Sequence, residues 1–113
     1  MHARAGHIPP GIETFGYTAL WYSNYLKTYR AIVTDHVKTI AAQLFAHVHA
    51  DEFRLLPGGG GGGGGGGGPI ITTGAISPVY NNNPSFKLVE PVFFRRRNSS
   101  KPIIFRRVLL IPR

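Results

Sequence analysis

The sequence predicts an incomplete α/β fold, and three observations lead to this prediction. Apolar residues recur at three- and four-residue spacing from about Leu20 to Thr39, which is typical of one amphipathic helix of roughly twenty residues. Residues 40–45 are mostly apolar and are interpreted as a short strand buried on both faces. Eleven consecutive glycines, residues 58–68, divide the chain into two segments, each near or below the length at which a domain folds unaided.

The helix needs a surface to pack on, because its apolar residues lie on one face. Trp21, Tyr29 and Val33 belong to this apolar face, whereas the charged residues fall largely between such positions. We therefore expect the helix to lie on a sheet. Periodicity alone does not separate a strand over residues 40–45 from continued helix, so that alternative stays open.

Further strands are expected on both sides of the glycine run. Residues 52–56, 69–75 and 86–89 are suited to strands, and residues 77–84 carry the prolines and asparagines of a loop. Residues 6–11 cannot form a regular helix, because two prolines remove amide donors and favour extended geometry before them. We expect a rigid loop there, and a disordered loop over the glycine run, whose backbone is unrestrained.

The positive charge of the chain is concentrated near its C-terminus. The formal net charge is +8, from 13 Lys and Arg against 5 Asp and Glu. Residues 1–57 hold five bases against four acids, whereas residues 69–113 hold eight bases against one acid. The basicity therefore belongs to a tail, residues 91–113, and says little about what the rest of the chain binds.

Composition also limits the available chemistry. The chain has no cysteine, so disulfides and thiolate metal sites are excluded, and any metal must be held by nitrogen and oxygen. No run of about eighteen apolar residues is present to span a membrane. The first residues are not followed by the apolar stretch of a secretory signal.

Three of the five histidines lie in segments that suit a metal site. His47 and His49 follow the predicted strand, and in an extended segment two side chains at this spacing project from one face. Neutral imidazole is the commonest metal ligand, although two histidines can also fall at this spacing by chance. His7 precedes two prolines, which suits a ligand that must be fixed in place, although it could simply be a loop residue.

Taken together, these segments resemble one family. Residues 6–11, Gly-His-Ile-Pro-Pro-Gly, are similar to a loop of the acid sphingomyelinase-like phosphodiesterases, which lie within the calcineurin-like metallophosphoesterases. Residues 42–53 resemble that family's Ala-Gln-Phe-Phe-Gly-His-Thr-His-x-Asp-Glu-Phe segment. Residues 77–78 and 82–84 are similar to its later Ser-x-x-Pro and Asn-Asn-Pro loop. The resemblance is specific because both histidine motifs occur in the same order along the chain as in the family.

The resemblance implies a fold, a metal centre and a reaction. Residues 1–90 would be the C-terminal part of a metallophosphoesterase domain, a partial α/β sandwich with one long helix and several strands. His7 and His47 would bind one divalent metal ion and His49 a second, with zinc as the expected metal and manganese as the alternative that the same ligands fit. The two ions would activate a hydroxide that hydrolyses a phosphodiester, such as a sphingomyelin-type phospholipid.

The same resemblance implies a role for the asparagine loop. Asn82 and Asn83 would help to bind the substrate at the mouth of the site. A loop that merely turns the chain is at least as simple an interpretation of these two residues.

The sequence also departs from the family pattern. Ala46 replaces a glycine, and its methyl group would strain the backbone if that position needs positive φ. The family's Asp-x-His pair, bridging aspartate and Asn-His pair are not found in the chain, so we expect the isolated chain to be inactive and its sheet edges to be exposed. The family is mostly secreted or lysosomal, but without a signal sequence the localisation is not indicated.

The tail supports a competing interpretation from another class of protein. Arginine clusters alternate with apolar residues over residues 93–111, a pattern compatible with a non-enzymatic module that contacts an anionic membrane or nucleic acid, although no specific nucleic acid is predicted. A tail read from an intron or a shifted frame would carry the same charges, and the charge begins where the resemblance stops. The binding module would be favoured if the chain binds anionic lipid vesicles in a salt-sensitive way and still binds them after alanine substitution of His7, His47 and His49.

Overall fold

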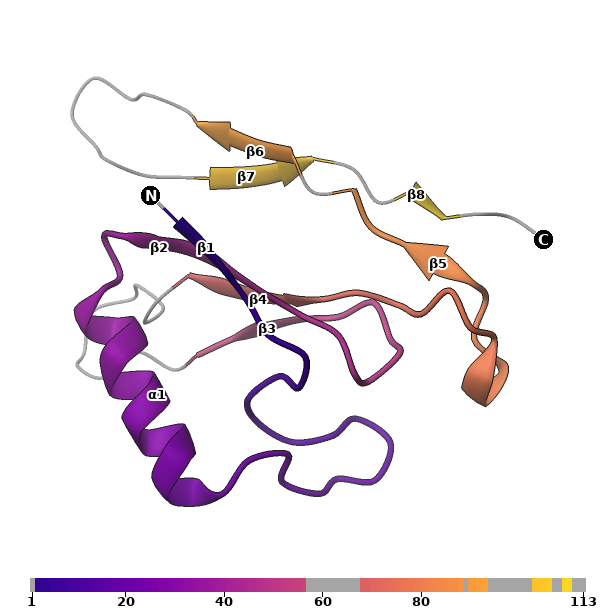
Figure 1. The fold of residues 1–113 in the computed structure, drawn as a ribbon, viewed down its shortest axis with the longest axis horizontal. Coiled ribbons are helices and arrows are strands. Elements are labelled where there is room, and N and C mark those ends of the chain that lie inside the picture. The colour runs from indigo at the N-terminus through magenta and orange to yellow at the C-terminus, as the bar shows by residue number, and fades with distance from the viewer. Residues whose placement is uncertain (1, 57–67, 89, 94–102, 107–108, 111–113) are drawn as a thin grey trace.

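The computed structural model describes residues 2–56, 68–88, 90–93, 103–106 and 109–110. One α-helix, one short 3₁₀ helix and eight strands follow one another within these residues (Figure 1). Their bounds, in chain order, are β1 His2–Ala5, α1 Ser23–Asp35, β2 Ile40–Phe45, β3 Phe53–Leu55, β4 Pro69–Thr72, η1 Val79–Asn81, β5 Ser85–Phe86, β6 Glu90–Phe93, β7 Ile103–Arg106 and β8 Leu109–Leu110.

A four-stranded sheet in the order β1-β2-β4-β3 forms the centre of the fold. β1, β2 and β4 pair in parallel, whereas β3 is antiparallel to β4. The helix connects the parallel neighbours β1 and β2, which is the usual way for a chain to return to the same end of a sheet (Figure 1). The predicted α/β class is therefore confirmed in its coarse form, while the partial metallophosphoesterase sandwich stays a prediction.

The predicted strands agree with the structure to different degrees. The strand over residues 40–45 is confirmed with the same bounds, and its pattern of burial shows both faces largely covered. β3 and β4 lie within the predicted ranges 52–56 and 69–75 but are shorter. The strand predicted over 86–89 has the wrong bounds, because β5 covers Ser85–Phe86 and shares only Phe86 with the prediction. β1 was not predicted, because four exposed residues carry no apolar alternation.

The helix is shorter than the periodicity predicted. It has 13 residues, because Tyr22 adopts extended φ and ψ of −62° and 142° before its first turn, and His36 leaves helical geometry after its last. The backbone N–H of Ile40 then bonds to the carbonyl of His36 and turns the chain into β2. The predicted ends at Leu20 and Thr39 are therefore wrong by about one turn each, since apolar residues continue into the connections.

The core lies between α1 and one face of the sheet. Val33 is the fully buried residue of the helix, and Trp21 and Tyr29 pack beside it. The buried apolar residues of this cluster are Val33, Ile40, Phe45, Leu56 and Ile70. Full burial of one such side chain contributes about 1.5–3 kcal/mol, so this small cluster supplies the main apolar stabilisation seen in the described part of the chain.

One polar side chain is buried within this layer. Gln43 has no exposed surface, accepts a hydrogen bond from the Tyr29 hydroxyl, and donates to the Gly68 carbonyl at 3.3 Å. These bonds connect the helix, β2 and the residue before β4, so they fix the helix on the sheet as well as satisfying the amide.

The C-terminal strands form a ribbon outside the main sheet. β5 pairs with β8 and β6 with β7, both antiparallel (Figure 1). The side chains of residues 90–113 lie outside the described residues, so the basic tail and its membrane or nucleic acid contacts stay predictions. The disordered loop predicted over 58–68 also lies outside them, except for Gly68. Among the described residues, no helix has the length and apolar character needed to cross a membrane.

Candidate histidine site at the carboxyl end of the sheet

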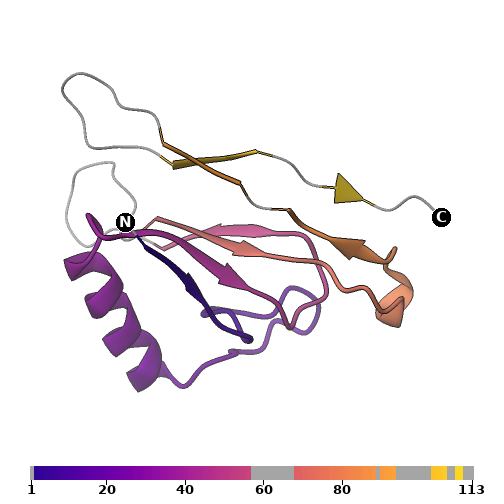
Figure 2. The ribbon, with the colours of Figure 1, turned by 45° about the horizontal axis from the view of Figure 1, so that its top comes forward.

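The two histidine motifs meet because they follow neighbouring parallel strands. β1 and β2 end at the same edge of the sheet, so residues 6–11 and 46–49 leave it side by side (Figure 2). The Gly6 N–H bonds to the Leu44 carbonyl and the Ala46 N–H to the His7 carbonyl, both at 2.9 Å. These two bonds continue the β1–β2 pairing into the loops and hold His7 beside the end of β2.

Gly6 lets the first loop approach the sheet closely. A methyl group at this position would lie 2.7 Å from Cε1 of Phe45, which is closer than real carbon contacts. Phe45 is itself buried in the core. Because this first glycine of the Gly-His-Ile-Pro-Pro-Gly motif packs directly against Phe45, the packing of the core determines where the loop that carries His7 leaves the sheet.

The imidazoles of His7 and His47 contact each other. Nε2 of His7 lies 3.3 Å from Nδ1 of His47, and the ring centroids are 5.1 Å apart with planes at 80°. Two nitrogens on one tetrahedral zinc ion, each about 2.0–2.1 Å from the metal, would be separated by roughly 3.3–3.4 Å. The spacing of the two nitrogens therefore suits a shared metal ion, and in the neutral state it also suits a hydrogen bond between the rings.

His49 has different neighbours. Its ring contacts that of Tyr80 edge to face, with centroids 5.6 Å apart. Its Nδ1 is buried without a hydrogen-bond partner among the described residues, which is uncommon for a polar atom and leaves a nitrogen able to bind a ligand. The structure thus groups His7 with His47 and gives His49 separate surroundings. In the part of the chain that is described, no three His, Asp or Glu side chains gather closely enough to hold one metal ion.

The prediction that His47 and His49 project from an extended segment is wrong. Their φ angles are 67° and 55°, so both lie in the left-handed region, with the buried Val48 between them. Left-handed backbone costs a residue with a side chain on the order of 1–3 kcal/mol, and such strain persists only where surrounding structure holds it. Ala46 is not among the residues with positive φ, so the replacement of the family's glycine strains no backbone there.

Asn82 supports this strained turn from the outside. Its Nδ2 donates a 2.9 Å hydrogen bond to the His49 carbonyl. Asn83, by contrast, is exposed. Of the two asparagines predicted to bind substrate, one therefore has a contact to the histidine turn, and a role in substrate binding stays a prediction for both.

Several residues that sequence reasoning missed hold the other side of the turn. The buried Thr72 hydroxyl lies 3.0 Å from the Ala50 carbonyl and accepts a 3.1 Å bond from the Glu52 N–H. Asp51 forms an ion pair with Lys87. Thr72 belongs to an apolar strand and Lys87 to no motif, so nothing in the local sequence pattern indicated that either would reach the turn.

The pairing of His7 and His47 at this edge is compatible with two nitrogen ligands of a divalent metal. Among the described residues no third ligand joins that pair, so the metal site predicted from the sequence stays a prediction. The site also contains Tyr80, whose contact with His49 could not be read from its place in a loop rich in proline and asparagine.

Comparisons with known proteins point to one protein family. The chain is 36% identical over 83 residues to Sphingomyelinase phosphodiesterase D of Dictyostelium discoideum, a match over 73% of this chain and 19% of that protein. It is 36% identical over 52 residues to human Acid sphingomyelinase-like phosphodiesterase 3b, and 33% identical over 51 residues to the mouse protein of that name. These two matches cover 45% and 44% of this chain and 11% of each relative.

The resemblance to the acid sphingomyelinase-like phosphodiesterases is thus confirmed. This chain is similar to a segment of that family and spans about a fifth or less of the length of these curated relatives. No protein-family model matches the chain.

Proposed function

We propose that this chain supplies part of the metal site of a phosphodiesterase that hydrolyses sphingomyelin-type phospholipids. The observation that carries the proposal is the 3.3 Å approach of His7 Nε2 to His47 Nδ1, made by motifs forty positions apart. The names of the relatives add the substrate class, because each is a sphingomyelinase or sphingomyelinase-like phosphodiesterase.

In this proposal His7 and His47 hold one divalent ion and His49 a second, with zinc as the expected metal. Bound ions of this kind lower the pKa of water and neutralise charge on phosphoryl oxygens. The chain's own contribution is to hold the ligand nitrogens in place before the metal arrives. The Ala46–His7 bond positions one loop on the other, and Asn82 holds the His49 carbonyl.

Metal binding by the purified chain tests the first part of the proposal. Zinc should shift the imidazole ¹⁵N resonances of His7 and His47, and affinity should fall in His7→Ala and His47→Ala. His36→Ala is the matched control, because His36 lies at the end of α1 and not in the histidine turns. Equal zinc affinity in all three variants would contradict the assignment.

A chimaera tests the second part. The segment of the Dictyostelium relative that matches this chain can be replaced by the corresponding residues of this chain and assayed for sphingomyelin hydrolysis. We expect turnover that disappears on His47→Ala. A folded chimaera with no turnover would show that this segment does not supply a working part of such a site.

A further inference from the structure

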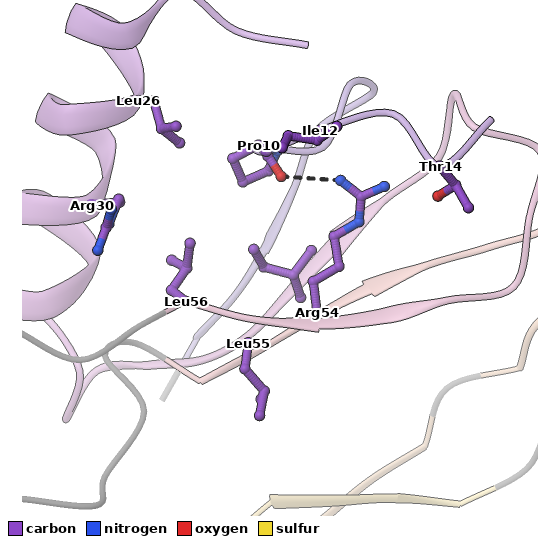
Figure 3. A pocket seen from close by; sticks show the side chains of 10 residues that line it. Pro10, Ile12, Thr14, Leu26, Arg30, Arg54, Leu55 and Leu56 are labelled. Carbon is purple, nitrogen blue, oxygen red and sulfur yellow. Dashed lines mark hydrogen bonds between the residues drawn. The ribbon is translucent and has the colours of Figure 1, made fainter. Parts of the chain in front are cut away.

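Arg54 contacts both loops that carry histidines. It lies in β3, and its Nη1 donates to the Pro10 carbonyl at 3.3 Å (Figure 3). Its Nη2 and Nε donate to one carboxylate oxygen of Glu52 at 2.9 and 3.3 Å. Pro10 is three residues after His7, and Glu52 is three residues after His49. One guanidinium therefore joins the far ends of the two loops.

Glu52 is itself held in place. Its second carboxylate oxygen accepts a hydrogen bond from the Thr14 hydroxyl, and its backbone N–H bonds to Thr72. The side chains of Arg54 and Glu52 are 17% and 19% exposed. A charge-assisted pair that is mostly withdrawn from water is stronger and better ordered than a surface ion pair, so it can transmit position between loops.

The final glycine of the first motif makes room for this contact. Gly11 has φ of 113°, a conformation that residues with side chains rarely adopt. A methyl group there would lie 3.3 Å from Arg54 Nη1. The motif's glycine thus turns the chain and leaves space for the guanidinium that bonds to the Pro10 carbonyl.

We propose that Arg54 is a positioning residue that sets the spacing between the imidazoles of His7 and His47. The backbone bonds at Gly6 and Ala46 fix one end of the first loop, and Arg54 fixes the other end at Pro10. Without the guanidinium the loop loses its tether at Pro10 and keeps the backbone bonds of Gly6, His7 and Gly11 and the bond from the Trp21 indole to the Ile8 carbonyl. Pro10 is the one of these points that ties the loop to the strand after the second histidine turn, so its loss lets the His7 ring move relative to that of His47. The use of this spacing to bind a metal rests on the proposed function, whereas the spacing itself can be measured without metal.

The test compares Arg54→Met with wild type in the full 113-residue chain. In metal-free protein, the nuclear Overhauser effect between the His7 and His47 ring protons should fall by at least half, while effects between α1 and β2 are kept. Zinc affinity should fall roughly tenfold, as is usual when a residue that orients a metal ligand is removed. Lys27→Met is the control, since it removes the same charge from an exposed position on α1.

Each outcome decides the proposal. A wild-type His7–His47 effect in Arg54→Met would overturn it, whatever the zinc affinity. If that variant does not fold, Arg54→Lys decides instead, because one ammonium cannot reproduce the fork that reaches both acceptors, so the effect should still weaken. If wild type binds no zinc but loses the ring contact on Arg54→Met, the proposed function fails and the positioning role is upheld.

Discussion

The carboxyl edge of the sheet and the helix layer differ in how fully their side chains and loops are held by neighbouring residues. At the edge, backbone bonds, Thr72, Asn82 and Arg54 all converge on two short loops, and strained residues are held there. In the helix layer, Val33 is fully buried, while Tyr22 and Tyr25 are 80% and 63% exposed.

Among the described residues, the hydrogen bonds that hold the histidine turns are present, whereas no covering surface is seen over Tyr22 and Tyr25. Hydrogen bonds between neighbouring loops can form within a short chain. Burial of large side chains, by contrast, needs area from a second layer packed against them. Four experiments test this difference between the two regions, beginning with the one for which we expect the greatest effect.

The largest expected effect is a complete absence of phosphodiesterase activity in the isolated chain, even with excess zinc or manganese. In the proposed site, His7 and His47 would give one ion two protein ligands and His49 would give the other ion one, whereas a catalytic zinc normally keeps three. The chain should be assayed against sphingomyelin and a chromogenic phosphodiester beside a His47→Ala, His49→Ala double variant. Metal-dependent turnover that the double variant lacks would show that the edge is complete by itself.

Ile70→Ala should lower the free energy of unfolding by about 2–5 kcal/mol, because Ile70 is 1% exposed and its loss leaves a cavity in the core. Denaturant unfolding measures this value. Tyr22→Ser is the control, and at 80% exposure it should change stability by no more than about 0.5 kcal/mol. Similar losses in both variants would mean that the helix layer is better covered than the described contacts show.

Asn82→Ala should cost about 0.5–1.5 kcal/mol and release the turn at His49, because the His49 carbonyl loses its side-chain donor. Amide hydrogen exchange should quicken at residues 48–50 and stay unchanged in α1. Asn83→Ala is the matched control at an exposed position. An unchanged exchange rate at the turn would remove Asn82 from the support of the site.

The smallest effect concerns pH. Burial raises the pKa of Tyr29 above its ordinary value of 10.0, against the lowering influence of nearby Arg4. The folded state therefore holds this proton more tightly than the unfolded state, so the stabilisation is present below pH 10 and is lost as pH rises through the folded pKa. Unfolding of wild type and Tyr29→Phe at pH 8 to 11 should show a steeper decline for wild type. Parallel curves would contradict the shift.

From the sequence alone, the loop over residues 6–11 and the candidate histidines followed, because two prolines exclude a regular helix. The strand over residues 40–45 was predicted with the right bounds, but periodicity left continued helix as an alternative that the structure removes. The helix was predicted but its ends were not, since Tyr22 and His36 leave helical geometry inside an apolar pattern that continues. The exposed β1 was missed because backbone pairing with β2, not its side chains, makes it a strand.

The backbone conformation and the neighbours of the histidines, by contrast, depend on contacts between distant segments. The spacing of His47 and His49 suggested one face of an extended segment, but both residues are left-handed and contact different rings. Conformations of this kind are unfavourable locally, so no local pattern predicts them. They exist because Asn82 and Thr72, more than twenty positions further along the chain, hold the turn in place through hydrogen bonds that form only when β4 and the loop after it lie beside β2.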